Sequence, residues 1–93
     1  MQTIAFTTGL DPAEAPALAT AAALAVVSGA RLVTVHASSG SRPVSDLPHP
    51  EHLAERWGRA IAHEELVHTC CDDVTDTLLD ALRRVKPELV IAG

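Results

Sequence analysis

The stretch Glu88–Gly93, ELVIAG, decides the fold of this chain. Its apolar residues Leu89 to Ala92 run on without polar alternation, which is typical of a parallel strand that is covered on both faces. Pro87 ends the segment before it, and Gly93 follows it. In an open α/β sheet, ligands bind just beyond the carboxyl ends of the strands. We therefore expect the chain to stop where a binding loop would begin.

Six further elements are predicted upstream of this strand, and strands alternate with helices. In order they are strand Thr3–Thr7, helix Asp11 to about Ser28, strand Arg31–Ala37, helix Glu51–Glu65, strand Leu66–Cys71 and helix Asp72–Arg84. This alternation predicts an α/β fold with a parallel sheet and right-handed crossovers. At 93 residues the chain is long enough for one small domain, residues 1–93.

The first helix has a complete set of end signals. Asp11 can cap the free N–H groups, Pro12 suits the first helical position, and Glu14 completes a capping box. Gly29 is the expected stop. We expect the inner face to consist of Leu18, Ala22, Ala25 and Val26.

The middle of the chain is less regular. Residues 38–50, SSGSRPVSDLPHP, are expected to form a flexible loop, because prolines, glycine and serines dominate them. In the helix predicted after it, Leu53, Trp57 and Ile61 recur at helical spacing. In the last predicted helix, Asp72 or Asp73 is the expected cap.

Composition excludes several classes of function. A net charge of −5 and an aromatic content of 2% disfavour nucleic-acid binding, which depends on basic and stacking residues. The longest apolar region falls short of the roughly 18 residues that a membrane helix needs, so we expect no membrane partner. Cys70 and Cys71 are adjacent and cannot form a standard disulfide framework, so a cytoplasmic location is the simplest expectation.

Three segments together resemble the universal stress protein family. They are the opening strand with its capped helix, SGARLVTVHA at 28–37, and DVTDTLLDALRRVKPELVIAG at 73–93. The resemblance implies a doubly wound, three-layered parallel sheet of the adenine nucleotide alpha hydrolase-like type. The implied strand order is 3-2-1-4, with the family's fifth strand, last helix and glycine loop missing, so the domain is expected to be truncated at its C-terminal end.

The resemblance also implies a ligand and partners. Many members bind ATP or another adenine nucleotide where strands 1 and 4 meet, and members commonly dimerise. We expect a homo-oligomer, or completion by the missing C-terminal segment. The positions that match the family's nucleotide contacts are Thr7, Thr8, Gly9, Ala37, Ala92 and Gly93. The chain departs from the pattern at Gly9, where ATP-binding members have an acidic residue. A shift of the turn by one residue could let Asp11 take the place of that acidic residue, but Asp11 is expected to cap the helix.

Other chemistry has weaker support in the sequence. His49, His52, His63, His68 and Cys70 have no zinc-ligand spacing, so we expect no metal site. We expect His36 to be a packed residue near a strand end, and the other histidines to lie on solvated helix and loop surfaces. The pairs Glu64-Glu65 and Asp72-Asp73 are expected at solvated helix ends. No nucleophile elbow is present, so no catalytic residue is predicted.

Three functions remain in view. The first is a non-catalytic universal-stress-type domain that senses adenine nucleotides or regulates the stress response through self-association. The second is an adenine-nucleotide-using enzyme subunit of the related α/β group, although a pyrophosphatase would need an S-G-G-x-D-S loop where this chain has TTGLDPAE at 7–14. The third is an interaction scaffold with a site that binds nothing.

Overall fold

The computed structural model describes residues 2–41 and 47–93. These residues form a parallel sheet with the strand order β3-β2-β1-β4, which confirms the predicted order. The strands are β1 Thr3–Thr7, β2 Arg31–Ala37, β3 His63–His68 and β4 Leu89–Ala92. The helices are the short 3-10 helix η1 Pro12–Glu14, α1 Ala15–Ser28, α2 Pro50–Glu55 and α3 Val74–Val85.

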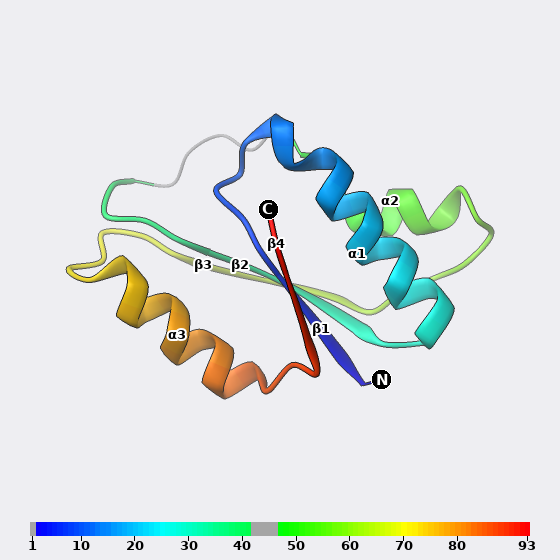
Figure 1. Ribbon diagram of the computed structural model, residues 1–93. Coiled ribbons are helices and arrows are strands. Elements are labelled where there is room, and N and C mark those ends of the chain that lie inside the picture. Colours follow the sequence, from blue (N-terminus) through cyan, green and yellow to red (C-terminus); the bar gives the residue numbers. More distant parts are fainter. Residues whose placement is uncertain (1, 42–46) are drawn as a thin grey trace.

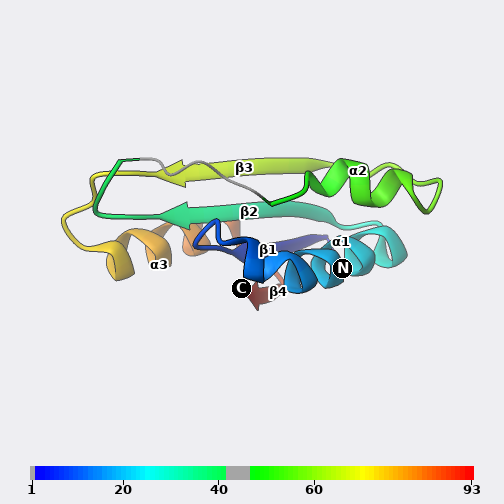
Figure 2. The same ribbon diagram turned by 90° about the horizontal axis from the view of Figure 1, so that it is seen from above.

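The sheet lies between two helical layers. Helices α1 and α2 cover one face and α3 covers the other (Figure 1). Viewed from above, β3 and β4 form the two edges of the sheet (Figure 2). The chain leaves β1 through α1 towards β2, and it returns through α3 to β4 on the other side of β1. This reversal beside β1 is the switch point of a doubly wound sheet.

The two central strands form the core. Strand β1 pairs with β2 from Thr3↔Arg31 to Thr7↔Val35, and with β4 from Ile4↔Leu89 to Thr7↔Ala92. On the α1 and α2 side, the core consists of Ile4, Phe6, Leu18, Ala21, Ala22, Ala25, Ala30, Leu32 and Leu53. On the α3 side it consists of Val33, Val35 and Ala81, with Leu66, Leu78 and Val85 packed around them. The alanines of α1 let this helix approach the sheet closely.

The predicted ends of the first helix are confirmed. The Asp11 side chain accepts a hydrogen bond from the Ala13 N–H, and Glu14 completes the capping box. The first turn is a 3-10 helix, and the α-helix begins at Ala15. Gly29 ends α1 in the left-handed region with φ 70°. Leu18, Ala22 and Ala25 are buried as expected, and Val26 is half-buried.

The second helix and the third strand differ from the prediction. Helix α2 ends at Glu55 instead of continuing to Glu65, and β3 covers residues 63–68 instead of 66–71. Gly58 adopts a positive φ of 66°, which turns the chain out of the helix. From residue 63 the backbone pairs with β2, starting at Leu32↔His63. Pairing satisfies the outer backbone groups of the buried strand β2, and this gain overrides the helical pattern of the segment.

The prediction that Leu53, Trp57 and Ile61 form one apolar stripe on the second helix is therefore wrong, because only Leu53 lies in α2. Leu53 is buried, but Trp57 follows the helix and is 48% exposed. Ile61 lies in the connection to β3. Of the expected flexible loop over 38–50, residues 42–46 lie outside the described residues, and Pro50 is already the first residue of α2.

Strand β3 ends at His68, so Cys70 and Cys71 lie beyond it. Cys70 has a φ of 56°, and both cysteines are free thiols. His68 is the last residue of β3, so His68 and Cys70 do not lie together on one strand. The pair Glu64-Glu65 lies within β3 and not at a helix end. In the described part of the chain, none of the helices has both the length and the apolar character needed to cross a bilayer.

Candidate functional site

The carboxyl ends of β1, β2 and β4 meet at one edge of the fold. The Gly93 N–H donates to the Thr7 carbonyl at 2.9 Å, and the Thr8 N–H donates to the Val35 carbonyl at 3.0 Å. These two bonds continue the pairing of β1 with both neighbours beyond the last residue of the strand. The turn after β1 is therefore held between the ends of β4 and β2.

The six positions expected to contact a nucleotide all lie at this edge. Thr7, Thr8 and Gly9 leave β1, while Ala92 and Gly93 end β4 directly beside Thr7. Ala37 is the last residue of β2. It lies two residues after Val35, which pairs with Thr7, and it pairs with His68 of β3. The structure thus brings Thr7, Thr8, Gly9, Ala92 and Gly93 together and places Ala37 one strand away. Their contact with a nucleotide stays a prediction.

A carboxylate of the chain itself lies within this edge. Glu14 accepts hydrogen bonds from the Gly9 N–H at 3.0 Å, from the Asp11 N–H at 3.1 Å and from the Thr8 hydroxyl at 3.1 Å. The Leu10 N–H in turn donates to the Thr8 hydroxyl oxygen at 2.9 Å. The donors of the β1–η1 turn are therefore bonded within the chain, and Asp11 serves as the helix cap that the sequence predicts.

Glu14 also accounts for the glycine at the end of β4. A Cβ atom added to Gly93 would clash with Glu14 Oε1. A side chain at this position would have to displace the Glu14 carboxylate from the turn. Gly93 thus has a structural reason to be glycine that is independent of any phosphate.

His36 lies beneath the same turn and is buried, as predicted. Its Nδ1 lies 2.8 Å from the Thr8 carbonyl oxygen, so Nδ1 carries the hydrogen and donates. The residue is 5% exposed, and among the described residues its Nε2 has no hydrogen-bond partner. His36 thereby fixes the carbonyl of Thr8 and positions the first residue of the turn from the neighbouring strand.

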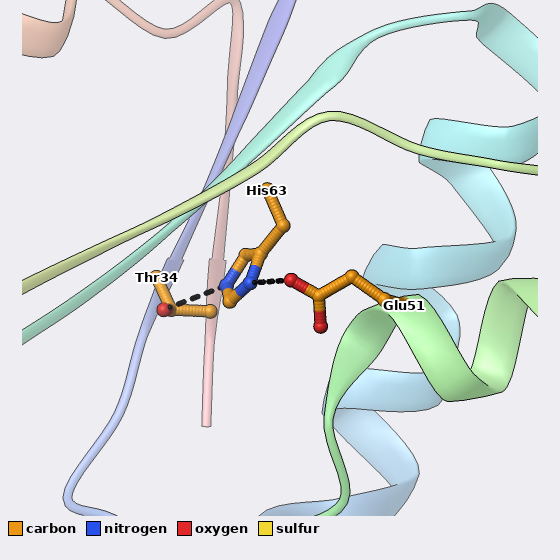
Figure 3. Close-up of polar contacts among 3 residues, drawn as sticks. All are labelled: Thr34, Glu51 and His63. Carbon is orange, nitrogen blue, oxygen red and sulfur yellow. Dashed lines mark hydrogen bonds and ion pairs between the residues drawn. The ribbon is translucent and has the colours of Figure 1, made fainter.

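A second polar cluster was not predicted from the sequence. His63 is the first residue of β3, and its side chain is 9% exposed, so the expectation that it lies on a solvated helix is wrong. Its ring lies between Thr34 of β2 and Glu51 of α2 (Figure 3). Histidine and glutamate twelve residues apart carry no recognisable spacing, so only the pairing register of β3 reveals this cluster.

The electrostatics of this cluster favour an ionised carboxylate. Burial acts to raise the pKa of the Glu51 carboxyl. Its backbone N–H, the hydrogen bond from His63 and the charge that His63 and His49 carry when they are protonated outweigh this effect, and they lower the pKa of Glu51 below the ordinary value of 4.5. Across residues 2–41 and 47–93, no three His, Cys, Asp or Glu side chains are grouped so that they could hold a metal ion.

Two solved structures share this architecture. A universal stress protein crystallised in complex with cAMP superposes with a TM-score of 0.64 at 18% sequence identity, over 97% of this chain and 74% of that chain. Protein Rv1636 from Mycobacterium tuberculosis H37Rv superposes with a TM-score of 0.59 at 20% identity, over 99% of this chain and 70% of that one. The chain therefore has a universal-stress-protein-like fold, and the resemblance seen in the sequence is confirmed at that level.

No family model matches the sequence, and no curated protein matches it significantly.

Proposed function

We propose that this chain is a non-catalytic universal-stress-type domain that binds an adenine nucleotide beyond the carboxyl ends of β1, β2 and β4. The observation that carries the proposal is the switch point itself. Strands β1 and β4 lie side by side, and their ends are joined by the bond from the Gly93 N–H to the Thr7 carbonyl. Open α/β sheets bind their ligands at such a point. The similar fold of the universal stress protein solved with cAMP supports an adenine nucleotide as the ligand.

The residues around this point suit a flat ligand. Gly9, Ala37, Ala92 and Gly93 have small side chains or none, so a base could approach the backbone closely. Since neither lysine nor arginine is among these positions, we infer that recognition depends on backbone groups and shape. In this role the domain would sense the nucleotide as part of a stress response.

Calorimetry with ATP and cAMP tests this proposal, with GTP as the comparison. We expect Ala37→Leu to weaken binding at least about tenfold, because a larger side chain would fill the space after β2. Ala60→Leu is a matched control, because Ala60 is exposed in the connection between α2 and β3. Binding of neither ATP nor cAMP by the wild-type protein would contradict the proposal.

A specific observation favours a second candidate, an interaction scaffold with a non-binding site. Glu14 already accepts the hydrogen bonds of the Gly9 N–H, the Asp11 N–H and the Thr8 hydroxyl, and its negative charge would repel a phosphate. Glu14→Ala separates the two candidates. Nucleotide binding by this variant alone would favour the scaffold, whereas binding by the wild-type protein would favour the sensor.

We further propose that the domain self-associates through β4. In the described sheet β4 pairs on one side only, with β1, and Val90 is 46% exposed. The opposite edge, β3, is rich in histidine and glutamate, which discourage strand pairing. The apolar edge of β4 has no such protection, so it is the edge that a second copy would extend.

A further inference from the structure

Three side chains from three elements form a continuous hydrogen-bonded chain on the α1 and α2 side of the sheet. The Glu51 Oε1 of α2 lies 2.6 Å from the His63 Nδ1 of β3. The His63 Nε2 lies 3.1 Å from the Thr34 Oγ1 of β2. Figure 3 shows the imidazole between the carboxylate and the hydroxyl. Thr34 is 8% exposed, so the chain begins at the partly exposed Glu51 and ends inside the protein.

The order of donors along this chain follows from the chemistry of its members. An ionised Glu51 carboxylate has no hydrogen to give, so the His63 Nδ1 must carry one and donate it. In the neutral imidazole the Nε2 is then an acceptor. The Thr34 hydroxyl has a single hydrogen, and it donates this hydrogen to Nε2. What remains on the Thr34 oxygen is acceptor capacity alone.

Thr34 and His63 open onto a pocket of about 110 Å³ between the sheet, the start of α1 and the segment that leads into α2. Much of its wall is apolar and consists of Phe6, Leu10, Leu18, Leu47, Pro48 and Pro50. The remaining polar residues on the wall are Thr8, His49 and Glu65. Neither lysine nor arginine occurs among the described residues that line it, and a glutamate does, so the wall does not suit a phosphate or a carboxylate.

We propose that this pocket binds a small uncharged molecule that combines a compact apolar group with one O–H or N–H donor, and that the donor bonds to the Thr34 Oγ1. A dry apolar cavity of about 150 Å³ is known to hold benzene. The pocket of about 110 Å³ therefore suits a ligand the size of phenol or smaller, which would reach partly into its mouth. A nucleotide is too large for this pocket, so it is a separate small-molecule site. The pocket borders the edge proposed for the nucleotide, because Thr8 belongs to both.

Within this site Glu51 and His63 are positioning residues. They fix the direction of the Thr34 O–H bond. The Thr34 oxygen can then accept a hydrogen bond from a ligand but has no hydrogen left to donate to it. A pocket built to accept a hydrogen bond discriminates strongly against an analogue that has no donor, because its buried acceptor is then left unpaired.

Phenol is the probe, and its binding to the full chain is followed by NMR chemical-shift changes. We expect shifts at Thr34, His63 and Leu18, and at least about tenfold weaker binding of anisole, which has the same ring but no donor. Thr34→Val has nearly the same shape without the acceptor, and it is expected to lose phenol binding to the same extent. Thr34→Ser should retain it. Thr75→Val is the matched control, since Thr75 is exposed on α3 across the sheet.

The tautomer of His63 gives a readout that does not depend on a ligand. Nitrogen NMR of the imidazole at neutral pH is expected to show the hydrogen on Nδ1, and a hydrogen on Nε2 would overturn the proposal. Equal binding of phenol and anisole to the wild-type protein, or no phenol binding at millimolar concentration, would also overturn it. Since the comparison of these two probes uses the wild-type protein, the test holds even if Thr34→Val fails to fold.

Discussion

At the scale of single residues, Glu51 links α2 to the sheet through His63. Its pKa in the folded protein is lower than 4.5, whereas in the unfolded chain the carboxyl titrates near its ordinary value. A carboxyl with a lowered pKa contributes stability above its unfolded pKa and loses it as the pH falls through the folded pKa. We therefore expect this contribution to be complete above pH 4.5 and to disappear below it.

Glu51→Gln tests this expectation, because glutamine can accept the His63 hydrogen bond without a charge. The variant should be less stable than the wild-type protein at neutral pH, by less than about 1 kcal/mol since Glu51 is partly exposed. The difference should vanish as the pH falls below 4.5. Urea denaturation at several pH values measures it, with Glu55→Gln on the exposed side of the same helix as control. A difference that does not change with pH would contradict the assignment.

Gly29 offers a second prediction at this scale. It ends α1 with φ 70°, and a Cβ atom added there would meet nothing within 4 Å. The cost of Gly29→Ala is therefore backbone strain alone, which we expect to lower the free energy of unfolding by about 1 kcal/mol. Gly40→Ala is the matched control, because Gly40 has the same open surroundings without a positive φ. Equal stability of the two variants in urea would show that the left-handed turn is not maintained in solution.

At the scale of secondary-structure elements, the start of α3 depends on one capping residue, Asp73, and the preceding Asp72 cannot take its place. The Asp73 side chain accepts a hydrogen bond from the Asp76 N–H at 2.9 Å. Asp72 carries the same charge one residue earlier and lies exposed outside the helix. We expect Asp73→Ala to destabilise the protein by about 1 kcal/mol in urea or thermal melts, and Asp72→Ala to have almost no effect. Similar losses in both variants would mean that charge near the helix end matters more than the cap.

How far the elements can be predicted from the sequence depends on where their stabilising contacts lie. Strands β1, β2 and β4 begin and end at the predicted residues, because each is an apolar run bounded by glycine, proline or a cap. The boundary between α2 and β3 was not predictable in this way. Residues 56–65 are predicted to continue the helix, and only pairing with β2, far away in sequence, makes the strand begin at His63.

The same distinction applies to the sites. The edge around Thr7 and Gly93 follows from the strand order alone, so it could be inferred from the sequence. The cluster of Thr34, Glu51 and His63 needs the exact register of β3 beside β2 and the early end of α2. Glu14 was predicted as part of a capping box, but its contact with the end of β4 follows only from the folded turn.

At the scale of the whole molecule, the two sheet faces are covered unequally. One face packs against α1 and α2 around Phe6 and Leu18, and the other against α3 alone. Helix α3 packs mainly on β2 and to a lesser degree on β1. Strand β4 lies beyond β1, at the edge of the sheet. This position explains why Val90 is nearly half exposed although it lies in an apolar strand.

An exposed apolar edge strand pairs readily with another strand, and a charge on it opposes this pairing. If β4 carries the proposed self-association, Val90→Lys should shift the protein towards monomer in sedimentation velocity. Val27→Lys is the matched control, because it makes the same exchange at a valine that is 86% exposed on α1, away from the edge. We expect the control to sediment like the wild-type protein. A wild-type protein that is monomeric at high concentration would exclude β4 as the contact. Equal shifts towards monomer in Val90→Lys and Val27→Lys would exclude it too, because they would show that the added charge acts wherever it is placed.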